Sequence, residues 1–155
     1  MENEIALQLA RETVDRMCSA LDGGGWQYTK GEDLLSIEFE VEGEDLPMSF
    51  NVSANPENSV LTLRSPLPIT VPADRRIDMA LAVCKINTRL NDGCFQYDMK
   101  NGLLYYCMTC GYTDSIMGNG AFLYEIFNSC AMVEEYNDRL LLVSEGVITP
   151  ENIIK

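Results

Sequence analysis

Two thiols separated by two residues, Cys107 and Cys110, are the most obvious candidates for chemistry in this chain of 155 residues. A Cys-x-x-Cys pair supports redox chemistry when it opens a helix, because the helix dipole lowers the pKa of the first thiol. It supports zinc binding when a second such pair completes the site. Here the motif lies in a predicted strand, and residues three apart in a strand point to opposite faces. We therefore expect structural cysteines, with a redox or metal role as the alternative.

The hairpin that contains these thiols is predicted by Asn101-Gly102, the strongest short hairpin signal. A two-residue turn at that point places Tyr97 opposite Tyr106. The same register puts the two thiols on different faces: Cys107 with Gln96 and Asp98, and Cys110 with Phe95, Tyr97 and Met99.

Other chemistry is limited by the absence of histidine from the sequence. Ser-His, Cys-His and His-metal sites within one chain are therefore excluded. The carboxylates Glu38, Glu40 and Glu42 recur at every second residue of a predicted strand, which favours a solvated sheet face, with a cation site or a paired-carboxylate catalyst as the alternative. We predict no catalytic residues, no metal site and no cofactor.

The charge balance bears on partners, because 24 acidic residues oppose 11 basic ones and the net charge is −13. Such a charge repels phosphates, so neither nucleic acid nor an anionic membrane is an expected partner. A basic or amphipathic protein partner is compatible with it. The acidic first residues do not resemble a signal peptide, and the six cysteines are dispersed, so we expect reduced thiols and a cytoplasmic location.

Hydrophobic periodicity predicts three helices and six strands in one domain over residues 1–155. The expected helices are 3–22, 77–90 and 121–145, and the expected strands are 26–29, 37–42, 48–53, 60–64, 94–100 and 103–110. The proline-rich segment 65–72 is predicted to be an irregular connector, because proline removes backbone donors. The order α-β-β-β-β-α-β-β-α predicts an α+β fold with a single, largely antiparallel sheet of five or six strands and three main helices.

The predicted helix 77–90 is apolar on two flanks, which one sheet cannot cover completely. We hypothesise that it contributes to a homodimer or to another protein complex, with cover by the first or third helix of the same chain as the alternative. The candidate interface residues are Ile77, Leu81, Cys84, Met79, Val83, Ile86 and Leu90.

The end of this helix and the following hairpin, residues 85–90, 93–98 and 102–106, resemble the YbjN-like family. Those domains typically have Ile-Asn near the end of a helix, here Ile86-Asn87, and then a Gly-x-Phe strand, here 93–95. The family is similar in architecture to type III secretion chaperones. The resemblance implies an α+β fold, frequent homodimerisation and binding of other proteins rather than catalysis.

These observations favour a non-enzymatic, chaperone-like or regulatory protein that binds an unidentified protein partner through a sheet face or the helix 77–90. The alternative is a small enzyme or ligand-binding protein that uses a cysteine thiol or carboxylates. The first function requires exposed apolar patches, whereas the second requires a concave pocket with converging polar groups.

Overall fold

The computed structural model describes residues 1–154. Its elements, in chain order, are α1 (Glu2–Gly23), β1 (Thr29–Lys30), β2 (Ser36–Val41), β3 (Met48–Asn55), β4 (Val60–Thr70), the 3-10 turn η1 (Ala73–Arg75), α2 (Arg76–Asn87), β5 (Cys94–Asp98), β6 (Leu103–Gly111), α3 (Asn119–Ser144) and the 3-10 turn η2 (Pro150–Asn152). This order confirms the predicted α+β class.

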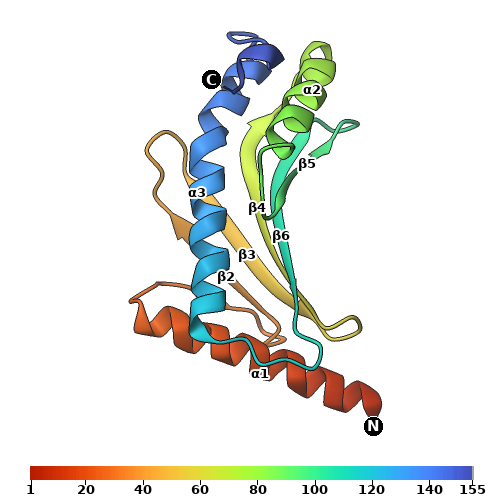
Figure 1. Ribbon diagram of the computed structural model, residues 1–155, viewed down its shortest axis with the longest axis vertical. Coiled ribbons are helices and arrows are strands. Elements are labelled where there is room, and N and C mark those ends of the chain that lie inside the picture. The colour runs from red at the N-terminus through yellow and green to blue at the C-terminus, as the bar shows by residue number, and fades with distance from the viewer. Residues whose placement is uncertain (155) are drawn as a thin grey trace.

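The strands form one sheet in the order β1-β2-β3-β4-β6-β5, with every neighbouring pair antiparallel. Helix α3 runs along the sheet, α1 crosses one end of it, and α2 lies at the other end beside β5 (Figure 1). Alternate residues of each strand therefore meet different surroundings. One set packs against α1 and α3 as the core, and the other set lines a face that no helix within residues 1–154 covers.

The core is a continuous apolar cluster between the inward sheet face and the helices. Phe50, Leu63 and Tyr106 are buried on three different strands, and Phe122 and Leu140 meet them from α3. None of the helices within residues 1–154 combines the length and apolar character that a membrane span requires.

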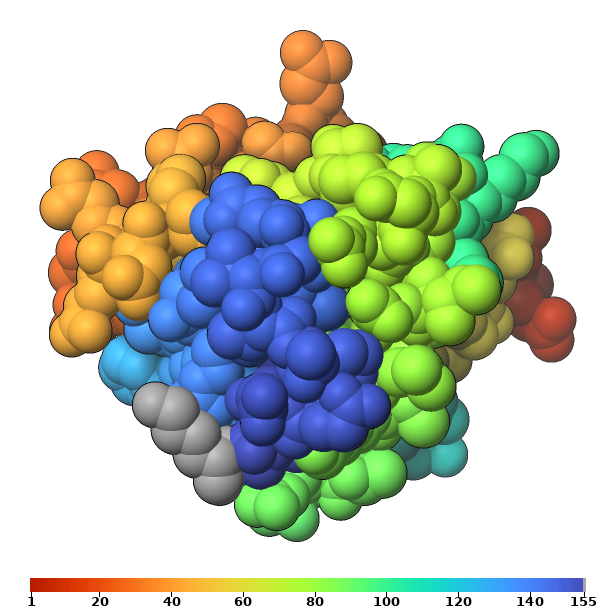
Figure 2. Space-filling view, turned by 90° about the horizontal axis from the view of Figure 1, so that it is seen from above, coloured from red at the N-terminus to blue at the C-terminus, as the bar shows by residue number. Residues whose placement is uncertain are grey.

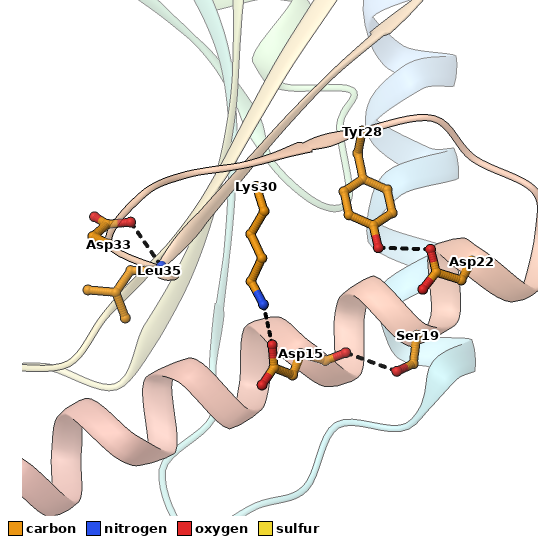
Figure 3. A network of polar contacts seen from close by, with 7 residues as sticks. All are labelled: Asp15, Ser19, Asp22, Tyr28, Lys30, Asp33 and Leu35. Atoms are coloured by element: carbon orange, nitrogen blue, oxygen red, sulfur yellow. Dashed lines mark hydrogen bonds and ion pairs between the residues drawn. The ribbon is translucent and has the colours of Figure 1, made fainter.

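The short strand β1 pairs with β2 at only two positions. Polar contacts with α1 also hold this part of the chain in place (Figure 3). Lys30 forms an ion pair with Asp15, and the Tyr28 hydroxyl donates to Asp22 Oδ1 over 2.8 Å. That hydrogen bond to a carboxylate raises the pKa of Tyr28. These contacts attach the edge of the sheet to the first helix.

The prediction of an irregular connector at residues 65–72 is wrong, because β4 continues to Thr70. Residues Ser65, Leu67 and Ile69 point inward and are buried, whereas Pro66 and Pro68 are exposed on the uncovered face. The pairing of β4 with β3 ends at Arg64. Beyond that residue β4 stays paired with β6, with a register shift between Pro66 and Thr70. Proline is tolerated where a strand lacks a neighbour on one side.

The predicted two-residue turn and its pairing of Tyr97 with Tyr106 are also wrong. Phe95 lies opposite Tyr106, and the ladder ends at Asp98 and Leu103, so four residues form the turn. Asp98 causes the difference: its backbone carbonyl accepts from Gly102 N–H over 2.8 Å, and its carboxylate accepts from the Asn101 side chain over 2.7 Å. The bonds that the carboxylate accepts from the Asn101 side chain and from the backbone N–H groups of Asn101 and Lys100 hold the pKa of Asp98 below its ordinary value.

Candidate functional site

Helix α2 presents an apolar stripe to solvent. Ile77 is 69% exposed and Leu81 is 54% exposed, and Cys84 is exposed on the same side. Their spacing of four and then three residues places them on one helical face. We call Ile77, Leu81 and Cys84 the α2 stripe.

The other residues of the predicted interface occupy different positions. Met79, Val83 and Ile86 are buried inside the chain, where α2 contacts α3, β5 and η2. Leu90 lies beyond the end of the helix and is half-buried against the core. The rest of the chain therefore covers one side of α2, and the α2 stripe remains exposed. Figure 2 shows the α2 segment at the surface beside the C-terminal end of α3.

The position of α2 is fixed by hydrogen bonds at both of its ends. At the first turn, Arg76 Nη1 donates to the Lys100 carbonyl in the hairpin turn over 2.6 Å. Near the last turn, Lys85 Nζ donates to the Glu151 carbonyl over 2.6 Å. The α2 stripe is therefore presented on a rigid element, as a specific protein interface requires.

Asn87 at the end of α2 links the helix to the edge strand of the sheet. Its Nδ2 donates to the Phe95 carbonyl over 2.9 Å, and its Oδ1 accepts from Phe95 N–H over 2.8 Å. Because β5 is an edge strand, these two bonds satisfy backbone groups that face away from β6. The amide side chain therefore takes the place of a further strand.

We expect Asn87→Ala to lower the free energy of unfolding by about 2 kcal/mol, because two partly buried backbone groups lose their partners. Asn91→Ala, at an exposed position in the following loop, is the matched control and should change stability by less than about 0.5 kcal/mol. Urea unfolding followed by circular dichroism measures both values. Equal midpoints for the two variants would show that Asn87 does not hold the edge strand.

The uncovered sheet face contains a groove of about 430 Å³ between the end of β2, the start of β3 and the second half of β4. Its lining is mainly apolar, with carboxylates at the rim, and comprises Glu40, Val41, Glu42, Pro47, Met48, Ser49, Pro66, Leu67 and Pro68. We call this feature the β3–β4 groove.

Prolines explain why the strands separate there. The β3–β4 ladder stops at the pair Asn51 and Arg64. Continued in the same register, it would set Ser49 against Pro66 and Pro47 against Pro68, and these prolines have no N–H to donate. The buried Ser65 hydroxyl instead donates to the Ser49 carbonyl over 2.7 Å, which satisfies one of the freed acceptors. Sequence reasoning missed the groove, although facing prolines in neighbouring strands were its signal.

The thiols are divided between the two faces, as the sequence predicts. Cys107 lies on the uncovered face, directly opposite Cys94. Cys110 pairs with the buried Leu61 and lies toward Glu125 of α3. Burial and the neighbouring Glu125 raise the pKa of Cys110 to about 11, and burial raises that of Cys130 to about 11. Within residues 1–154, no three Cys, Asp or Glu side chains are grouped to hold a metal ion.

Solved structures share this fold. YbjN from E. coli, proposed to be a transcription regulator, matches with a TM-score of 0.59 and 10% identity over 88% of this chain and 93% of that one. A chain of the HopA1–SchA chaperone–effector complex matches with a TM-score of 0.53 and 10% identity over 80% of this chain and 91% of that one. These matches confirm the YbjN-like and chaperone-like architecture expected from residues 85–106. No protein-family model and no curated sequence matches the chain.

Proposed function

We propose that this chain is a non-enzymatic, chaperone-like protein of the cytoplasm that forms a homodimer through the α2 stripe and binds a further protein at the β3–β4 groove. The shared fold supports the class, since a chaperone–effector complex contains it. The observation that carries the proposal is the exposure of Ile77 and Leu81 on a helix whose other side is buried in the core. Apolar side chains gathered on a rigid surface are typical of protein interfaces.

A second copy of the chain is the partner that best fits the α2 stripe. The chain carries a net charge of −13, yet the three stripe residues are uncharged, so two copies can meet there without placing like charges at the contact. A two-fold axis passing near Leu81 would pair each stripe with itself.

The β3–β4 groove has the features of a site for an extended segment of another protein. Its apolar lining accepts an aliphatic or aromatic side chain, and Glu40 and Glu42 at its rim attract lysine or arginine beside that side chain. The expected partner therefore carries an apolar residue flanked by basic residues.

Thiol catalysis, the alternative function, receives no support from the thiols that face the core. A cysteine nucleophile works as the thiolate, which requires a lowered pKa. Cys18, Cys110 and Cys130 all have raised pKa values, chiefly because burial disfavours the charged form. These residues are therefore interpreted as structural.

The groove proposal is tested by replacing Glu40 and Glu42 together with lysine. Tagged protein recovers partners from the native cell, and mass spectrometry quantifies them against wild type. Glu2→Lys with Glu4→Lys, at exposed positions of α1, is the control with the same charge change. We expect the groove variant to lose about tenfold of its specific partner, because reversed rim charges repel a basic segment, and the control to lose none. Equal recovery by both variants would contradict a partner site at the groove.

A further inference from the structure

Two cysteines lie opposite each other on the uncovered sheet face. Cys94 of β5 is the cross-strand partner of Cys107 of β6, and neither thiol is in a disulfide. Cys94 is partly exposed, whereas Cys107 is 9% exposed. Sequence spacing directs attention to Cys107 and Cys110, but the strand register joins Cys107 to Cys94 instead.

The backbone pattern sets the distance between these two residues. Phe95 directs both its N–H and its carbonyl to Asn87, away from β6. Because hydrogen-bonded and non-hydrogen-bonded pairs alternate along an antiparallel ladder, the adjacent Cys94–Cys107 pair is a hydrogen-bonded one. Opposite Cα atoms in such a pair are about 5.5 Å apart, which lies within the usual range for a disulfide. Both side chains point to the same face of the sheet.

The surroundings of the pair distinguish the roles of the two thiols. Arg64 of β4 is the neighbour of Cys107 on its other side, and its guanidinium lies over the Tyr105 ring at 4.4 Å from the ring centre. Burial and the nearby Cys94 raise the pKa of Cys107, and Arg64 partly opposes that rise. The more accessible Cys94 is therefore the thiol that an external reagent reaches first.

We propose that Cys94 and Cys107 form a reversible intrachain disulfide when the folded protein meets a small disulfide such as oxidised glutathione. The Cys94 thiolate attacks one sulfur, the S–S bond of the reagent breaks, and one glutathione leaves. Cys107 then attacks the Cys94 sulfur of the mixed disulfide and releases the second glutathione. The two cysteines lose two protons and two electrons, and the reagent is reduced to two glutathione thiols.

The test uses the folded full-length protein, treated with oxidised glutathione, alkylated and mapped by mass spectrometry. We expect wild type to lose the mass of two hydrogen atoms, with the cross-link between the peptides that contain Cys94 and Cys107, and dithiothreitol to reverse it. Cys110→Ser, on the same strand but the opposite face, and Cys84→Ser, on the exposed α2 stripe, should form the same bond. Cys94→Ser and Cys107→Ser should not.

Two results would overturn the proposal. In the first, wild type accumulates only a stable mixed disulfide of Cys94 with glutathione. In the second, the intrachain bond joins a different pair of cysteines, or forms only after denaturant is added. Each would show that the register of β5 and β6 does not bring the two sulfurs into bonding distance.

Discussion

Gly102→Val is expected to lower the free energy of unfolding by roughly 3 kcal/mol or more. Gly102 has a φ of +72°, a left-handed conformation that a β-branched residue resists at about 1–2 kcal/mol. A Cβ at this position would also lie 2.5 Å from the Val71 carbonyl oxygen. Gly102 O accepts from Val71 N–H over 2.8 Å, so relief of the clash disturbs that bond as well.

Gly111→Val is the matched control, since Gly111 is the last residue of β6 and a Cβ there meets no atom within 4 Å. It should change stability by less than about 0.5 kcal/mol. Urea unfolding of both variants provides the comparison. A Gly102→Val midpoint equal to that of Gly111→Val would mean that the hairpin turn is not built as described.

The hairpin also shows which part of the fold the sequence can predict. Asn101-Gly102 correctly predicts a reversal of the chain, but not the hydrogen bonds to the Asp98 carboxylate that extend the turn to four residues. The resulting shift of two residues moves Phe95 to the position opposite Tyr106. An even shift leaves every side chain on its predicted face. The prediction that Cys107 and Cys110 lie on opposite faces is therefore correct, although the predicted register is wrong.

The prediction of an irregular connector at residues 65–72 was wrong for a different reason. Proline content indicates a break, yet the alternation of Leu67 and Ile69 with Pro66 and Pro68 is that of a half-buried strand. Local composition cannot report that β3 ends its ladder at Asn51 and leaves β4 without a neighbour on that side. The same tertiary context creates the β3–β4 groove, so the groove was beyond prediction from element order alone.

The candidate interface residues of α2 were predicted as one group, and the structure separates them. Helical periodicity indicates that both flanks are apolar, but it cannot identify which flank α3 and η2 cover. In the fold, Met79 and Ile86 are buried, and Ile77 and Leu81 are exposed. The oligomeric state itself stays a prediction.

We expect Leu81→Glu to weaken the proposed homodimer by roughly 100-fold, because each copy would bring an unpaired carboxylate into an apolar contact at a penalty of about 3 kcal/mol. Two-fold symmetry also sets the two new charges near each other. Leu81 is 54% exposed in the single chain, so the fold of the monomer should be preserved. Circular dichroism and the urea midpoint check that expectation.

Sedimentation equilibrium of wild type, Leu81→Glu and the control Ile5→Glu tests the role of the α2 stripe most directly. Ile5 is 65% exposed on α1, which makes Ile5→Glu the same kind of change on another helix. We expect a wild-type mass twice that of one chain, a folded monomer for Leu81→Glu and a dimer for Ile5→Glu. A wild type that stays monomeric at every concentration, or a Leu81→Glu variant that dimerises as tightly as wild type, would contradict this expectation.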